Sequence, residues 1–101
     1  MVGWDNGAWI RYDLGTPRTI GYLRIAFYNG NQRQTSFDVQ VSNDDTSWST
    51  IATNVTSGGT TTQLETFDVP DTTARYIRYW GHGNTLNLWN SLIEVDIFAL
   101  P

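Results

Sequence analysis

The sequence predicts an all-β protein, an antiparallel β-sandwich with little or no helix. Apolar and polar residues alternate along several segments, and no window keeps apolar residues at the spacing of one helix face. Turn-forming residues separate these segments at short intervals, as is typical of sandwiches. The 101 residues are enough for one core, so residues 1–101 are expected to form a single domain.

Each expected strand follows from its own alternation. The first, 9–14, has Ile10, Tyr12 and Leu14 on one face and leads into Gly15-Thr16-Pro17, a sequence that favours a turn. On the last expected strand, 92–99, Ile93, Val95 and Ile97 should share a face, with Glu94 and Asp96 opposite them. The strands expected between these two, bounded by loops rich in Gly, Pro, Asn, Asp or Ser, are 20–27, 37–42, 48–53, 66–69 and 75–80.

Composition narrows the class of function. The net charge is -4 and all six basic residues are Arg, so nucleic acid and membrane surfaces are not expected as partners. The chain contains no Cys, which excludes thiolate metal sites and a Cys nucleophile. No recognisable catalytic motif places an acidic pair, so the chain is not expected to be an enzyme. Abundant Thr, Ser, Asn and Asp favour a secreted or extracellular surface protein.

The expected strand directions decide which loops meet. If successive antiparallel strands alternate in direction, the loops after Phe27, Thr53 and Trp80 lie at one end with the N-terminal segment. That end collects the aromatic, amide and cationic side chains that suit sugars, because rings cover apolar C–H faces and amides or guanidinium groups bond hydroxyls and carboxylates. The candidate ligand-binding residues there are Trp4, Asn29, Asn31, Arg33, Trp80, His82, Asn84, Asn87, Trp89 and Asn90.

Several of these side chains have an ordinary structural alternative. Arg33 either clamps a uronate carboxylate or is a solvated loop arginine. His82 either bonds a ligand or packs within its loop, and one of Trp80 and Trp89 is expected to pack into the sandwich. Trp9 and Trp48 are expected to be structural, and Arg78 is expected to be partly buried with Asp13 as its partner.

Three stretches together resemble one family. They are Trp9-Ile10-Arg11-Tyr12-Asp13-Leu14-Gly15, the segment from Phe37 to Trp48 with Ser42-Asn43-Asp44-Asp45, and Ala74-Arg75-Tyr76-Ile77-Arg78 running through Gly81-His82-Gly83-Asn84 to Val95. The chain resembles the discoidin domain, also called the coagulation factor 5/8 type C domain, in the carbohydrate-binding variant attached to bacterial polysaccharide lyases and hydrolases. The resemblance implies a galactose-binding-like jelly roll that binds a polysaccharide or oligosaccharide through its end loops.

The resemblance also has departures. The family's first strand and its Asp-Gly-Asn-x-x-Thr loop have no counterpart before Trp4, and Asp45 stands where the family usually has Gly. A structural calcium is implied at Glu94, although the loop that supplies its other ligands is missing; the plain alternative is a solvated carboxylate. The missing strand supports a second hypothesis, a protein–protein or assembly module that forms a homo-oligomer through an open sheet edge.

Overall fold

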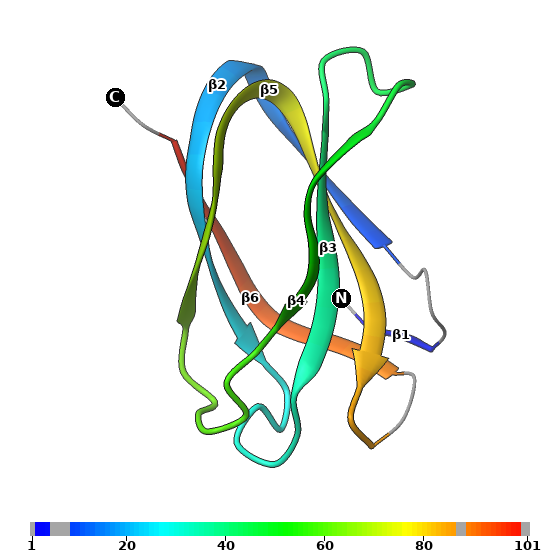
Figure 1. Cartoon of the computed structure of the whole chain (residues 1–101), viewed down its shortest axis with the longest axis vertical. Helices are drawn as coiled ribbons and strands as arrows, with labels where there is room; N and C mark the ends of the chain where they lie inside the picture. Colours follow the sequence, from blue (N-terminus) through cyan, green and yellow to red (C-terminus); the bar gives the residue numbers. More distant parts are fainter. Residues whose placement is uncertain (1, 5–8, 87–88, 100–101) are drawn as a thin grey trace.

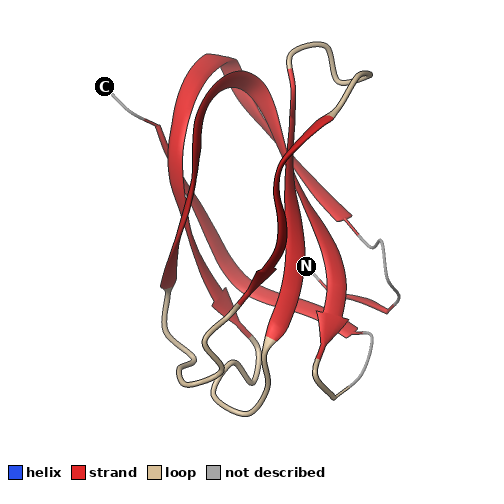
Figure 2. Cartoon of the chain, viewed as in Figure 1, coloured by secondary structure: helices blue, strands red, loops and turns tan. Residues whose placement is uncertain are grey.

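The computed structural model of the chain describes residues 2–4, 9–86 and 89–99, with the side chains of 9–86 and 91–99. These residues form strands and loops only, which confirms the all-β prediction (Figure 2). No helix in the described part is long and apolar enough to cross a membrane. The six strands are β1 (Val2–Trp4), β2 (Trp9–Phe27), β3 (Thr35–Ser42), β4 (Ser49–Thr56), β5 (Glu65–Asn84) and β6 (Trp89–Ala99).

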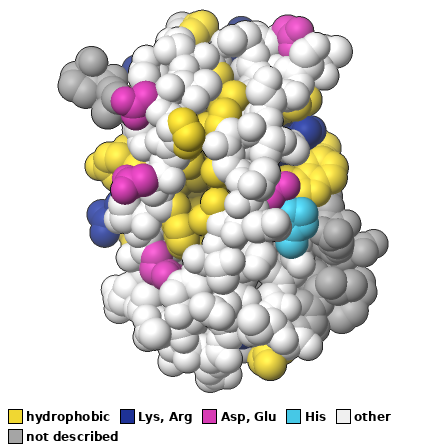
Figure 3. Space-filling model, in the orientation of Figure 1, with side chains coloured by type: hydrophobic (Ala, Val, Ile, Leu, Met, Phe, Trp, Pro, Cys, Tyr) yellow, Lys and Arg dark blue, Asp and Glu magenta, His cyan; other side chains and the backbone are white. Residues whose placement is uncertain are grey.

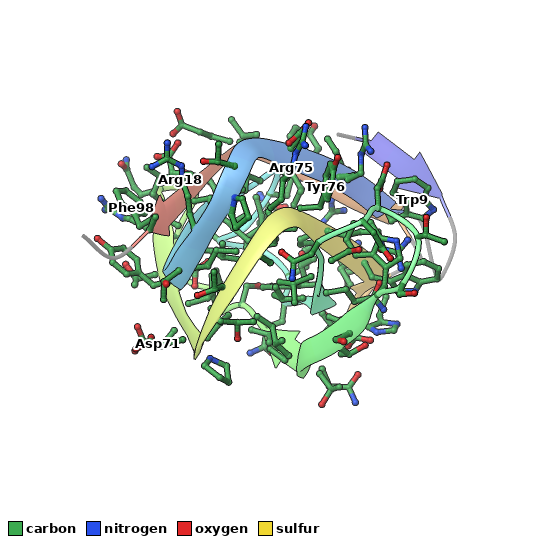
Figure 4. The ribbon with its side chains drawn as sticks, turned by 90° about the horizontal axis from the view of Figure 1, so that it is seen from above. Trp9, Arg18, Asp71, Arg75, Tyr76 and Phe98 are labelled. Atoms are coloured by element: carbon green, nitrogen blue, oxygen red, sulfur yellow. The ribbon has the colours of Figure 1, made fainter. Side chains whose placement is uncertain are left out.

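Two long strands build both layers of the sandwich. β2 and β5 arch over one end of the molecule and descend on its other side, as the view from above shows (Figures 1 and 4). The strand order is β1-β6-β2-β5-β3-β4. The first half of β2 and the second half of β5 form one layer with β3 and β4, while the second half of β2 and the first half of β5 face them with β6.

The expected turn at Gly15-Thr16-Pro17 is a bend within a continuous strand. Gly15 has a φ of 84°, in the left-handed region, and the β2–β5 register shifts between Asp13 and Arg18. The prediction of separate strands 9–14 and 20–27, and of separate strands 66–69 and 75–80, was therefore wrong. The chain still reverses direction at this bend, so the expected alternation of ends survives.

The core fills the space between the two layers. Ile20, Ile25, Phe27, Phe37 and Val39 have no exposed surface, and they come from β2 and β3. The Phe37 ring stacks on the Tyr79 ring, with 4.7 Å between the ring centres, and meets the Phe67 ring edge-on, with 5.2 Å between the centres. Aromatic packing of this kind fixes the spacing of the layers, and with it the positions of the loops they carry.

One inward position on β6 was predicted wrongly. Val95 and Ile97 pack against the core, but Ile93 is 61% exposed. The β2–β6 register shifts between Ala26 and Phe27, so that Phe27 pairs with Leu92 and Ala26 with Glu94. This bulge turns Ile93 outward and places Leu92 in the core. Beyond Ser91, no described strand pairs with the outer edge of β6, and an oligomer through that edge stays a prediction.

Candidate functional site at the loop end

Three connections meet at the end of the sandwich opposite the β2–β5 arch (Figures 1 and 2). They are residues 28–34, residues 57–64 and residues 85–86; we call them together the loop end. The turns at 43–47 and 70–73 lie at the other end, where the Asn43 side chain accepts a hydrogen bond from the backbone N–H of Arg75. Counting strand directions therefore predicted the grouping of the loops.

Gln34 and Thr35 tie the three connections together. The N–H of Ser57 donates to the carbonyl of Thr35 at 2.9 Å, and the N–H of Thr35 donates to Ser57 Oγ at 2.8 Å. The N–H of Thr85 donates to the carbonyl of Gln34 at 2.9 Å, and Gln34 Nε2 donates to the carbonyl of Ser57. Ser57 is 1% exposed, so this network is shielded from water and holds the loops in place.

Arg33 and Tyr28 are paired at the loop end. The Arg33 guanidinium carbon lies 5.8 Å from the centre of the Tyr28 ring, and Tyr28 is 57% exposed. Arg33 is half-buried, and its Nε is buried with no hydrogen-bond partner among the described residues. An arginine held against a ring presents its remaining donors to the solvent side in a fixed fork. This arrangement suits a planar anion such as a carboxylate.

The amides around this pair serve two roles. Asn29 has a φ of 53° and its carbonyl accepts from the N–H of Gln32, so it shapes the turn, whereas Asn31 is exposed. Asn84 ends β5, and its Oδ1 accepts from the N–H of Leu86 at 2.9 Å. That bond closes a turn, which gives Asn84 a structural role. Asn87 lies outside the described residues, as do the side chains of Trp4, Trp89 and Asn90.

Trp80 was expected to end the strand 75–80 and His82 to lie in the loop after it, but β5 continues to Asn84 and carries both residues. Because Tyr79 and Gly81 are buried, Trp80 and His82 face the opposite way, onto the outer surface of the sheet. His82 Nε2 lies 2.9 Å from Asp38 Oδ1. Figure 3 shows the histidine in cyan beside an acidic side chain and below a group of apolar side chains.

Arg78 has a different partner from the one predicted. Its predicted partner Asp13 instead pairs with Arg75, at 2.9 Å from Nε, and Arg78 Nε donates to Gln40 Oε1 at 2.7 Å. The hydrogen bonds from Arg75 and from the N–H of Gly15 hold the pKa of Asp13 at about 2. Partial burial lowers the pKa of Arg78, which remains a cation at neutral pH.

Glu94 is exposed on β6, beside a shallow depression that Arg24 and Ile93 also line. Calcium takes six to eight oxygen ligands in proteins, several of them carboxylates. No group of three or more His, Asp or Glu side chains surrounds Glu94 within the described ranges, and the nearby Arg24 opposes a cation. The described residues therefore do not fit a calcium site.

Two features of this region were not predicted from the sequence. The first is the exposed Tyr28. It directly follows the buried Phe27 at the start of a polar loop, and an aromatic residue in that position could have been predicted to lie on the surface of the loop end. Trp9 was expected to be structural but is 51% exposed, and its neighbours across the sheet are Trp80 and Arg78. Only the pairing of β2 with β5 brings these residues together.

Comparison with protein families gives a match over residues 2–95 to the F5/8 type C domain. Among curated proteins, none matches the chain. Solved structures include two with 39% sequence identity over 96% of this chain: a truncated AlyQ with CBM32 and alginate lyase domains, and the CBM32 of AlyQ in complex with 4,5-unsaturated mannuronic acid. Their TM-scores are 0.91 and 0.90, and the chain covers 25% of the former and 74% of the latter.

A third similar structure is a pectin-binding carbohydrate-binding module, with 21% identity, a TM-score of 0.89, and coverage of 99% of this chain and 71% of that one. At this identity the likeness shows the shared fold. The layers, the arching strands and the position of the loop end thus belong to a known architecture, which confirms the jelly roll expected from the sequence.

Proposed function

The chain belongs to the F5/8 type C domain family and is a non-catalytic carbohydrate-binding module; from this premise we propose that its loop end binds a uronic acid residue through Arg33 and Tyr28. Arg33 donates to the sugar carboxylate, the Tyr28 ring covers an apolar face of the sugar, and Asn31 bonds its hydroxyls. The AlyQ module with 39% identity is described in complex with an unsaturated mannuronic acid, which supports an acidic sugar.

The observation that carries the proposal is the state of Arg33. Its guanidinium lies over the Tyr28 ring, and the loop that carries it is held at Gln34 by hydrogen bonds to Ser57 and Thr85. An arginine that served only solubility would not need this framework. A guanidinium that is already held in position loses little conformational entropy when the ligand binds. Its charge-assisted hydrogen bonds then contribute fully to affinity.

The test is calorimetric titration with 4,5-unsaturated mannuronic acid and with short mannuronate oligosaccharides. Arg33→Ala should weaken binding about tenfold or more, because hydrogen bonds to charged groups contribute roughly 1.5–3 kcal/mol. Tyr28→Ala should weaken it as well. Arg18→Ala is the matched control, because Arg18 is an exposed arginine on the arch at the opposite end. Unchanged affinity in Arg33→Ala would refute the assignment.

A polyuronate ligand also indicates where the module works. Polyuronates are extracellular polymers too large to enter a cell, so we propose that the protein carrying this module is secreted or displayed on a surface. Attachment to the polymer would then keep that protein near its substrate, and several copies would gain from avidity. The net charge of -4 is unfavourable for a polyanion at long range, so the local cation at Arg33 decides recognition.

A further inference from the structure

The outer surface of the layer formed by β2, β5, β3 and β4 carries an ordered set of side chains that does not include the loop-end pair Arg33 and Tyr28. Trp9 lies opposite Trp80, and Trp80 opposite Asp38, in one row across three strands. In the next row Arg11 lies opposite Arg78, and Arg78 opposite Gln40. Residues in such rows point to the same face, so the sheet itself builds this surface.

Three tryptophans surround one guanidinium on this surface. The Arg78 guanidinium carbon lies 4.1 Å from the ring centre of Trp48, 5.0 Å from that of Trp80 and 5.3 Å from that of Trp9. Trp9 is 51% exposed, and the side chains of Trp48, Arg78 and Trp80 are half-buried. Figure 4 shows Trp9 at the right-hand margin of the fold. A shallow depression opens here, lined by Trp9, Ile10, Arg11, Asp45, Trp48 and Arg78.

The cations on this surface have different partners. Arg11 is paired with Asp45, whereas His82 Nε2 lies 2.9 Å from Asp38 Oδ1. Arg78 bonds only the neutral Gln40 amide among its described hydrogen-bond partners, and no described carboxylate lies within ion-pair distance of it. The depression therefore combines the exposed indole of Trp9 and the half-buried indole of Trp48 with a cation that is not neutralised by a directly bonded carboxylate. Its chemistry complements a ligand with apolar faces and a negative charge.

We propose that this surface, defined by Trp9, Trp48, Arg78 and Trp80, is a second binding site, for the chain of an anionic polysaccharide such as a polyuronate. One sugar ring stacks on Trp9 and Trp80, and a carboxylate of the chain approaches the Arg78 guanidinium. The proposed loop-end site takes one sugar residue, whereas this surface extends across β2, β5 and β3 and would accept an internal stretch of polymer. The two sites together would favour long chains over short oligosaccharides.

The experiment compares binding of high-molecular-weight polymannuronate and of a mannuronate disaccharide to the wild type, Trp9→Ala, Arg33→Ala and the double variant. Trp9→Ala should weaken polymer binding about tenfold while leaving disaccharide binding unchanged. Trp9 is exposed at the start of β2, so its replacement spares the core; melting temperature verifies the fold. Ile93→Ala is the control, because Ile93 is an exposed apolar residue on the other layer, 61% accessible.

The outcomes separate this proposal from the one for the loop end. If Arg33→Ala loses disaccharide binding while Trp9→Ala binds polymer like the wild type, the second site is refuted and the loop-end site stands. If Trp9→Ala alone loses polymer binding, the second site stands and the loop-end assignment fails. If neither variant loses binding, both site assignments are refuted.

Ionic strength and a neutral polymer supply an independent readout. In Arg33→Ala, the remaining polymer binding should weaken from about 0.01 M to about 1 M salt, across which the Debye length falls from about 30 Å to about 3 Å. The same variant should bind a neutral mannan more weakly than polymannuronate. Equal binding of both polymers, or residual binding that does not respond to salt, would overturn the role given to Arg78.

Discussion

Gly30 lies where the 28–34 loop touches the 57–64 loop, and replacing it with alanine perturbs the framework of the loop end without touching Arg33 itself. A Cβ at this position would lie 2.4 Å from the carbonyl oxygen of Thr61 and 3.1 Å from that of Phe27. Both are backbone atoms, so no side-chain rotation relieves the contact. The φ of Gly30 is not in the left-handed region, so the expected effect is a steric one.

The magnitude follows from the size of this overlap. Forcing one extra carbon into a packed site typically costs about 1–3 kcal/mol, and Gly30 is buried between two backbones. For a domain of this size, each kcal/mol lowers the melting temperature by about 4–8 °C, so Gly30→Ala should melt about 4–24 °C below the wild type. The two loops must separate to accept the methyl group. Arg33 lies three residues further along the same loop, so the variant should bind mannuronate more weakly than the wild type.

Thermal melting by circular dichroism and calorimetric titration measure both effects. Gly58→Ala is the matched control in the facing loop: its Cβ would lie 3.1 Å from Glu65 Oε1, the end of a side chain that can shift at the expense of its hydrogen bond from the Gly58 N–H. Gly58→Ala should therefore lower the melting temperature less than Gly30→Ala. The reasoning fails if Gly30→Ala melts with the wild type, or if Gly58→Ala is destabilised as much as Gly30→Ala.

Two further predictions concern the fold. Tyr79 Oη is buried without a hydrogen-bond partner among the described residues, so Tyr79→Phe should leave stability unchanged or raise it by up to about 1 kcal/mol in urea unfolding; a clear loss would reveal a partner for the hydroxyl. The pKa of Asp13 is held at about 2 in the folded state against 3.8 ordinarily, so its contribution to stability is present above pH 3.8 and is lost as pH falls towards 2. Asp13→Asn should therefore reduce the loss of stability over this range, measured as melting temperature against pH, and an unchanged profile would contradict the pairing with Arg75.

The alternation of apolar residues predicted most of the strands because it directly reflects burial on one face of a sheet. It could not show that β2 and β5 are continuous, since a bend at Gly15 and a turn there have the same local sequence. It also misplaced Ile93, because a bulge shifts the register by one residue and its position depends on the partner strand, Ala26 and Phe27. Local patterns carry no information about such pairings.

The sequence by itself determined the fold class, the end at which the loops meet, and Arg33 as a candidate for binding an acidic sugar. The first two follow from hydrophobic periodicity and strand direction, which are properties of the chain alone. Only the tertiary structure decided that Trp80 and His82 face the outer sheet surface, that Arg78 lies among three tryptophans, and that Arg33 rests on Tyr28. Those neighbours come from distant segments, and cross-strand register and loop packing bring them together.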